Sequence, residues 1–215
     1  MVAKGPVAGT LNRSHVRFQR NFPHEPGDPP PRIDPVNDLA IVVPLKEFTR
    51  AKSRLRDGGV VGVDDHIREM ATRVVVACRP RRVFVPCESD DVEEFARALS
   101  LTPLRTAATT LNEAVTLAYR QLSDEFSRVM IVHADLRYPE GLGQFEPRSG
   151  VTIVTDHRGR GTNVLVVPTS LDFRFSFGED SARTHQFESA RIGAEWRVVR
   201  DSPWRFDVDE PEDLL

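Results

Sequence analysis

Short apolar runs alternate with longer segments of helical periodicity from residue 38 onward. The first run, LAIVVPL (39–45), is apolar throughout and has the length of a strand. Similar runs predict strands at RVFVPC, RVMIVHAD (128–135), GVTIVTD and TNVLVVP, with a last extended segment near the end of the chain.

Between these runs, apolar residues recur at intervals of three and four. The pattern predicts three helices, marked by Ile67, Met70, Ala71, Val74 and Cys78, by Val92, Phe95, Ala96 and Leu99, and by Leu111, Val115, Ala118 and Leu122. Asp64 and Asp65 are candidate caps of the first helix, and a further helix is expected from about Asp180 to Ile192.

This alternation favours an α/β fold of Rossmann-like type. Strands that are apolar throughout are typical of a mostly parallel central sheet with helices on both faces. In such sheets ligands bind outside the carboxyl ends of the strands. We therefore expect the chemistry in the loops that follow residues 45, 135, 155 and 206.

Residues 1–37 differ from the rest of the chain. They lack periodicity and carry a crowded set of prolines: Pro23, Pro26, Pro29, Pro30, Pro31 and Pro35. Such a polar, proline-rich segment cannot bury enough apolar surface to order itself. We expect residues 1–37 to form a flexible extension and residues 38–215 to form one catalytic domain.

Composition narrows the function classes. A chain of 215 residues that is 40% hydrophobic suits one domain with a substantial core. Its net charge of −3 gives no general support for binding nucleic acid. No apolar run approaches the length of a membrane span and no secretory signal opens the sequence, so we expect a cytoplasmic protein without a membrane partner. Cys78 and Cys87 fit buried reduced thiols.

The loop PLKEFTRAKSRL (44–55) concentrates positive charge after the first strand. It holds Lys46, Arg50, Lys52 and Arg54, and thus two of only three lysines in the chain, so an arginine-rich bias does not explain it. Flexible cations here suit a triphosphate whose pyrophosphate leaves. The alternative is a solvated basic loop. The glycine spacing of a Walker loop or a dinucleotide fingerprint is missing.

Carboxylates close two of the predicted extended segments. Asp135 ends an apolar strand, where its oxygens suit Mg²⁺, although a turn or helix-cap aspartate is the alternative. In RFDVDEPEDLL, an extended backbone places Asp207 and Asp209 on one face and Val208 on the other. Two like charges on one face repel each other, and a shared cation would allow them to lie together. His133 precedes Asp135 on the same face, and as a lone histidine it is interpreted as a core residue.

Glycine-containing turns supply a second group of candidates. TDHRGRGTNVLVV places Thr162 and Asn163 beside glycines that allow close backbone approach, as a plain hairpin would also require. FSFGEDSARTH places Gly178 and Ser181 ahead of a helix, whose free N–H groups suit a phosphate or carboxylate. The alternative is an ordinary helix start capped by Asp180 or Ser181.

Taken in order, the motifs RAKSRL, LNEAV, HADL, DHRGRGTNVL, FGEDSARTH and DVDEPEDL resemble those of one family over residues 39–215. The chain is similar to the 2-phospho-L-lactate guanylyltransferases of deazaflavin coenzyme F-420 biosynthesis, including their relatives that use phosphoenolpyruvate. This resemblance implies a nucleotidyltransferase fold akin to glycosyltransferase A.

The resemblance also implies roles for individual residues. It assigns divalent metal, as two Mg²⁺ ions or Mn²⁺, to Asp135, Asp207 and Asp209. It assigns the phosphorylated acceptor to Thr162, Gly178 and Ser181. It places Lys46, Lys52 and Arg54 at the GTP phosphates as catalytic cations, and Leu111 and Asn112 near the base.

Four positions depart from the family pattern. Arg137 stands where a proline is usual, and Thr110 stands where a glycine is usual. Glu179 and Asp180 replace a small, glycine-rich turn beside the expected acceptor phosphate, where they either repel the anion or point to solvent.

The predicted activity is Mg²⁺-dependent transfer of GMP from GTP to phosphoenolpyruvate or 2-phospho-L-lactate, with release of pyrophosphate. The next transferase of the F-420 pathway is an expected partner. Two alternatives stay open: a nucleotidyltransferase with another nucleotide or acceptor, and a non-catalytic paralogue that binds a nucleotide. The sequence leaves the acceptor acid and the oligomeric state undetermined.

Overall fold

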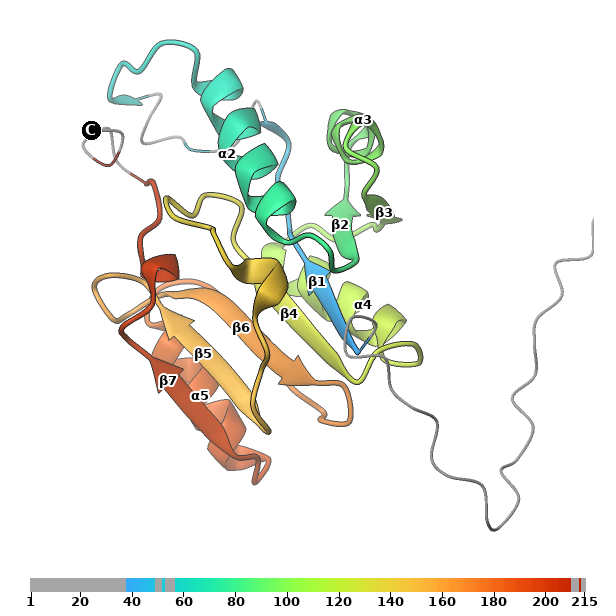
Figure 1. Ribbon diagram of the computed structural model, residues 1–215, viewed down its shortest axis with the longest axis vertical. Helices are drawn as coiled ribbons and strands as arrows, with labels where there is room; N and C mark the ends of the chain where they lie inside the picture. The colour runs from blue at the N-terminus through green and yellow to red at the C-terminus, as the bar shows by residue number, and fades with distance from the viewer. Residues whose placement is uncertain (1–37, 49–51, 53–56, 210–212, 214–215) are drawn as a thin grey trace, which may run out of the picture. The chain divides into compact units, whose positions relative to one another are not determined.

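A central sheet runs through the part of the protein that the computed structural model describes, residues 38–48, 52, 57–209 and 213 (Figure 1). Its seven strands lie in the order β3-β2-β1-β4-β6-β5-β7. The strands are β1 (Leu39–Val42), β2 (Val83–Cys87), β3 (Thr102–Arg105), β4 (Arg128–Val132), β5 (Val151–Thr155), β6 (Thr162–Pro168) and β7 (Trp196–Val199).

The sheet is mostly parallel, as predicted. Every neighbouring pair is parallel except the two pairs made by β6, which is antiparallel to both β4 and β5. All the strands predicted from apolar runs are present. The sequence pattern did not predict β3, an edge strand whose residues TPLR include a proline and are exposed at both ends, with Leu104 as the buried residue.

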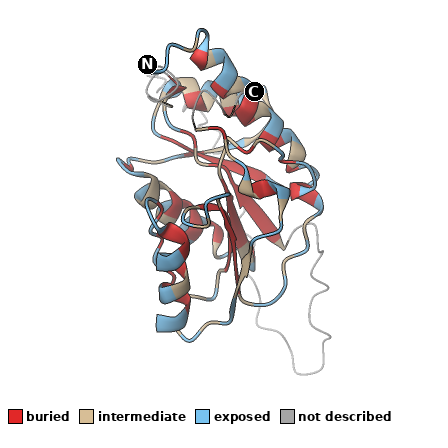
Figure 2. Cartoon of the chain, turned by 90° about the vertical axis from the view of Figure 1, so that its left-hand side faces the viewer, coloured by how far each residue is buried: buried red, intermediate tan, exposed pale blue. Residues whose placement is uncertain are grey.

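Four helices cover the two faces of the sheet within the described residues. They are α2 (Val63–Ala77), α3 (Asp90–Ala98), α4 (Leu111–Leu122) and α5 (Ser181–Arg191). One core cluster joins α2 and α3 to one face, and the other joins α4 and α5 to the opposite face. Figure 2 shows buried residues concentrated in the sheet and on the inward sides of the helices.

Alternation along each strand divides the two cores. In β1, Leu39 and Ile41 belong to the cluster under α2, whereas Ala40 and Val42 belong to the cluster under α4. Both faces of the strand are therefore buried, which explains why the sequence LAIV is apolar without interruption. β1 ends at Val42, three residues before the predicted limit, and Pro44 has no N–H with which to extend the ladder.

The structure corrects the predicted N-caps of two helices. Gly62, in a left-handed conformation, caps α2, while Asp64 and Asp65 lie in its first turn, where their charges favour the helix dipole. Asp180 occupies the N-cap position of α5, but its side chain makes no capping hydrogen bond there. Cys78 and Cys87 are free and buried, as expected, and burial raises the thiol pKa of Cys87 to about 11.

The topology gathers several chain segments at one edge of the sheet. The parallel strands β2, β1 and β4 end there, and the reversed strand β6 begins there, since Val132 pairs with Val164. The backbone N–H of His133 extends this pairing by donating to the carbonyl oxygen of Asn163 at 3.0 Å. The residues after β4 and those at the start of β6 are therefore neighbours.

Candidate active site

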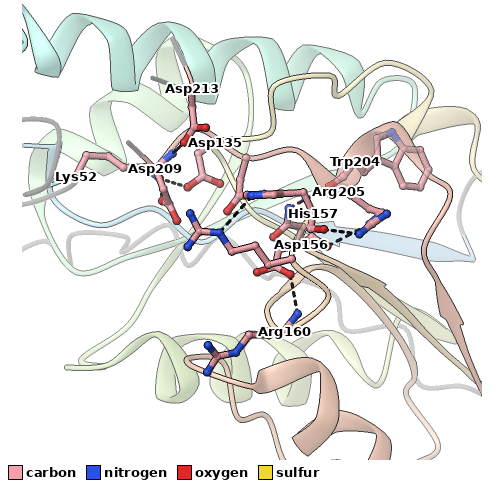
Figure 3. A network of polar contacts seen from close by, with 12 residues as sticks. Lys52, Asp135, Asp156, His157, Arg160, Trp204, Arg205, Asp209 and Asp213 are labelled. Atoms are coloured by element: carbon pink, nitrogen blue, oxygen red, sulfur yellow. Dashed lines mark hydrogen bonds and ion pairs between the residues drawn. The ribbon is translucent and has the colours of Figure 1, made fainter. Parts of the chain in front are cut away.

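An ammonium group joins two carboxylates from distant parts of the chain (Figure 3). Lys52 Nζ donates to Asp209 Oδ1 at 2.6 Å and also donates to Asp135 Oδ2. The side chains of Lys52 and Asp135 are only 15% and 19% exposed, whereas that of Asp209 is 49% exposed. The structure thus brings Lys52, which was predicted to lie at the GTP phosphates, into contact with two of the three carboxylates that were predicted to hold metal.

Each of these charges depends on the others. Burial by itself would lower the pKa of Lys52, but attraction to Asp135 and Asp209 outweighs it and raises the pKa above the ordinary value. Burial likewise favours the neutral form of Asp135, yet the Lys52 ammonium holds the pKa of this carboxyl below its usual range. Lys52 and Asp135 are therefore both charged near neutral pH.

Asp207 behaves differently from its two partners. Burial, followed by repulsion from Asp135 and Asp209, raises the pKa of the Asp207 carboxyl. The ring of His157 lies beside it, with Nδ1 3.8 Å from Asp207 Oδ1. Among the described residues, no lysine or arginine forms an ion pair with Asp207, in contrast to Asp135 and Asp209.

The backbone explains how Asp207 and Asp209 reach Asp135. Leu136 and Asp207 form an antiparallel bridge, and the N–H of Val208 donates to the carbonyl oxygen of Asp135 at 3.0 Å. Val208 is 5% exposed and packs in the core below α2. The extended segment therefore places Val208 inward, as predicted from the period of two.

The donor set of this cluster suits a hard divalent cation. Asp135 Oδ1 is buried and has no hydrogen-bond partner among the described residues, so one carboxylate oxygen is available to an ion. Carboxylate oxygens are the ligands that Mg²⁺ prefers. With Lys52 between Asp135 and Asp209, no set of three acidic, histidine or cysteine side chains in the described ranges has the spacing of a bound metal.

A separate pocket of about 260 Å³ opens where β1 and β2 end and α4 begins. Lys46 and Leu111, two of the predicted nucleotide residues, line it. Asn112 is engaged elsewhere, because its side-chain amide accepts from the Phe177 N–H at 2.7 Å and donates to the Phe177 carbonyl oxygen at 3.2 Å. Arg54, the remaining predicted nucleotide residue, lies outside the described residues.

The predicted acceptor residues also lie together. Ser181 Oγ donates to Thr162 Oγ1 at 3.2 Å, and the N–H of Ser181 donates to the Gly178 carbonyl oxygen at 3.2 Å. Both hydroxyl-bearing residues are 2% exposed. Gly178 itself is exposed and has a φ of 138°, in the region that favours glycine.

A histidine that the sequence analysis did not single out organises these hydroxyls. The N–H of Ser176 donates to His185 Nε2 at 3.1 Å, so Nδ1 carries the proton and donates to Thr162 Oγ1, also at 3.1 Å. Burial, with a smaller contribution from His133, lowers the pKa of His185 to about 4. The ring is therefore neutral at pH 7.

Glu179 and Asp180 share one cation from the neighbouring turn. Arg160 donates to Glu179 Oε1 at 2.6 Å and to Asp180 Oδ1 at 2.7 Å. Arg160 is itself held by its backbone N–H, which donates to Asp156 Oδ1 at 2.8 Å. The two carboxylates that depart from the family pattern thus share one counterion, and the three side chains together keep one net negative charge.

The sequence matches a family model described as guanylyl transferase CofC like over residues 39–215. The chain belongs to this family. It is 31% identical over 188 residues to the phosphoenolpyruvate guanylyltransferase of Roseiflexus castenholzii, covering 83% of this chain and 87% of that protein. It is 26% identical over 203 residues to the enzyme of the same name from Mycolicibacterium gilvum, covering 84% and 89%.

Solved structures confirm the fold. A nucleotidyl transferase from Methanothermobacter thermautotroptrophicus aligns with a TM-score of 0.58 at 15% identity, covering 83% of this chain and 94% of that one. The 4-diphosphocytidyl-2C-methyl-D-erythritol synthase of Anaerococcus prevotii aligns with a TM-score of 0.57 at 9% identity, covering 83% and 95%. The predicted nucleotidyltransferase fold is therefore present.

Family membership makes the chain a guanylyltransferase, which confirms the predicted enzyme class. The described helices include none with the length and apolar character needed to cross a membrane.

Proposed function

We propose that this guanylyltransferase transfers GMP from GTP to phosphoenolpyruvate in a Mg²⁺-dependent reaction that releases pyrophosphate, with 2-phospho-L-lactate as the second candidate acceptor. The observation that carries the proposal is the pairing of Lys52 with Asp135 and Asp209 at the end of β4. The relatives named phosphoenolpyruvate guanylyltransferase favour phosphoenolpyruvate over phospholactate.

In this reaction the protein has to orient the two substrates and stabilise the negative charge on their phosphates. A phosphate oxygen of the acceptor attacks the α-phosphorus of GTP, and the bond from that phosphorus to the bridging oxygen of pyrophosphate breaks. No general base is needed, because the attacking phosphate is already ionised at neutral pH. Lys52, which exchanges its carboxylate contacts for phosphate oxygens, and Lys46 neutralise negative charge on the donor.

Asp135, Asp207 and Asp209 are the residues that would hold Mg²⁺. When bound, the ion supplies Lewis-acid stabilisation of charge on the phosphoryl oxygens. The unpartnered oxygen of Asp135 and the raised pKa of Asp207 support this assignment, since a cation relieves both the orphaned acceptor and the repulsion among the carboxylates.

The acceptor is proposed to bind beside Gly178 at the amino end of α5. The Thr162, Ser181 and His185 network fixes this end of the helix against the start of β6. Arg160 offsets one of the two negative charges of Glu179 and Asp180, which reduces their repulsion of an incoming acid.

The product of this reaction would enter coenzyme F-420 biosynthesis, with the next transferase of that pathway as its recipient, in the cytoplasm. Two other functions compete with this proposal: guanylyl transfer to a different acceptor, and a paralogue that binds nucleotide without turnover. The non-catalytic paralogue would differ from an active enzyme in that its carboxylate cluster does not support turnover.

The test is pyrophosphate release by purified protein with GTP, Mg²⁺ and each acid in turn. Asp135→Asn should abolish release that depends on the acceptor, whereas the matched control Asp124→Asn, at an exposed position, should leave it unchanged. Nucleotide-induced thermal stabilisation without turnover would favour the binding paralogue. Turnover that survives in Asp135→Asn contradicts the assigned cluster.

A further inference from the structure

The pocket at the ends of β1 and β2 has the composition of a site for a flat heterocycle. Its walls are largely apolar, and its volume of about 260 Å³ accommodates one aromatic base. The apolar contributors are Pro44, Leu45, Pro86, Ala108, Leu111 and Ala114. With Lys46 at the same pocket, a base and the start of its phosphate chain can be held together.

Glu88 is the one carboxylate that lines this pocket among the described residues. It follows directly after β2 and is exposed to solvent. Within the described part of the chain, its side chain makes no hydrogen bond or ion pair.

Neighbouring acidic side chains already form hydrogen bonds or ion pairs within the protein. Glu113 accepts from the backbone N–H groups of Thr109 and Thr110 in the capping box of α4. Glu93 pairs with Arg97 and Arg105. Glu88 is therefore the acidic group at this pocket that is free to meet a ligand.

Hydrogen-bond chemistry identifies the base that a carboxylate prefers. A carboxylate accepts two parallel hydrogen bonds from adjacent donors. Guanine presents such a pair, N1–H and the N2 amino group, on its Watson–Crick edge. Adenine and cytosine each place an amino donor beside a ring acceptor, and uracil places one donor between two carbonyl oxygens.

We propose that Glu88 determines guanine specificity by accepting hydrogen bonds from N1–H and N2–H₂ of the nucleotide base. The proposal rests on the proposed function, in which GTP is the donor, and adds the residue that selects this nucleotide. The apolar walls pack on the faces of the base, while Glu88 reads its edge.

Three nucleotides test this assignment. Inosine triphosphate lacks the N2 amino group, and xanthosine triphosphate carries a carbonyl oxygen in its place. The wild-type protein should bind GTP roughly ten- to hundredfold more tightly than either analogue, the range expected for one hydrogen bond to a charged group. Affinities are measured by calorimetry and do not require turnover.

The Glu88→Gln variant is expected to gain affinity for xanthosine triphosphate. A glutamine amide accepts from N1–H and donates to the xanthine oxygen, so this variant should bind xanthosine triphosphate more tightly than GTP. Glu88→Ala should bind GTP and inosine triphosphate about equally. The control Glu94→Gln makes the same chemical change at an exposed site of α3 outside the pocket and should keep the wild-type order.

The outcomes separate this proposal from the proposed function. Turnover with GTP combined with an unchanged nucleotide order in Glu88→Gln overturns the role of Glu88 alone. Selective GTP binding that reverses in Glu88→Gln without any turnover supports Glu88 and counts against the catalytic proposal. A wild-type protein that binds the three nucleotides equally overturns the assignment, whatever its activity.

Discussion

At the scale of single residues, the Lys52 ammonium holds together carboxylates that are separated by more than seventy positions in the chain. It contacts Asp135 after β4 and Asp209 near the end of the sequence. Breaking such a pair by removing the cation leaves poorly solvated negative charges without compensation. Lys52 should therefore contribute to stability before any substrate is bound.

Replacing Lys52 by methionine should lower the free energy of unfolding by about 1–2 kcal/mol at pH 7 in the absence of divalent ions. This loss is smaller than that expected for a fully buried ion pair, because the side chain of Asp209 is half exposed. Mg²⁺ should then stabilise the Lys52→Met variant more than the wild type, since the ion compensates the same carboxylates. Urea unfolding with EDTA or MgCl₂ measures both effects.

Lys46→Met provides the control for this experiment, because Lys46 is exposed and lies at the neighbouring pocket. It should change neither the stability nor the response to Mg²⁺. Equal stabilisation of wild type and Lys52→Met by Mg²⁺ would show that Lys52 and the ion do not share a site.

Sequence reasoning singled out Asp135 and Asp209 because each closes an apolar stretch, and Lys52 because it belongs to a basic loop after the first strand. It did not find Arg160, Glu88 or His185. Their roles depend on which turn or helix lies beside them, and this is settled only by tertiary packing. The glycines on either side of Arg160 marked the turn but gave no indication of its partners Glu179 and Asp180.

At the scale of elements, the start of α4 explains one departure from the family pattern. Thr110, which replaces the usual glycine, is the N-cap residue, and its hydroxyl accepts from the N–H of Glu113 at 3.2 Å. The Glu113 carboxylate accepts in return from the N–H of Thr110, also at 3.2 Å. The substitution therefore gives the helix a capping box.

Thr110→Ala should destabilise the protein by about 1 kcal/mol, whereas Thr110→Gly should cost only a few tenths, because glycine tolerates the N-cap position far better than alanine. Chemical denaturation of the two variants measures the difference. Equal losses in both would mean that the threonine hydroxyl does not cap the helix.

Elements with strong periodicity were predictable, and the exceptions have physical causes. All four described helices and the strands buried on both faces were expected from their apolar patterns. β3 was missed because an edge strand needs to bury only one face, and Leu104 is its single buried residue. The caps of α2 were misassigned because Gly62 takes a left-handed conformation, which sequence spacing does not reveal.

At the scale of the whole molecule, the neutral His185 ring makes stability depend on pH. Its pKa falls from 6.5 to about 4 on folding, mainly through burial, so the unfolded chain binds this proton more readily. The stabilisation is complete above pH 6.5 and is lost as the pH falls toward 4. Its full size is roughly 3 kcal/mol.

His185→Gln should flatten the fall in unfolding free energy between pH 6.5 and 4 relative to the wild type. The control His66→Gln, at an exposed position of α2, should leave the slope unchanged. Unfolding free energies measured by urea titration at a series of pH values give both slopes. An identical slope in wild type and His185→Gln would contradict the buried, neutral ring.

The reversal of β6 has a consequence for how this protein can diverge. Because β6 runs against its neighbours, residues 156–161 form a hairpin turn between β5 and β6 and arrive at the edge of the sheet where β1, β2 and β4 finish. The segments proposed to hold the nucleotide and those proposed to hold the acid therefore come from separate stretches of chain. Substitutions at Thr162, where β6 begins, or in the turn at 178–181 can therefore change the acid while the nucleotide half of the site keeps its sequence.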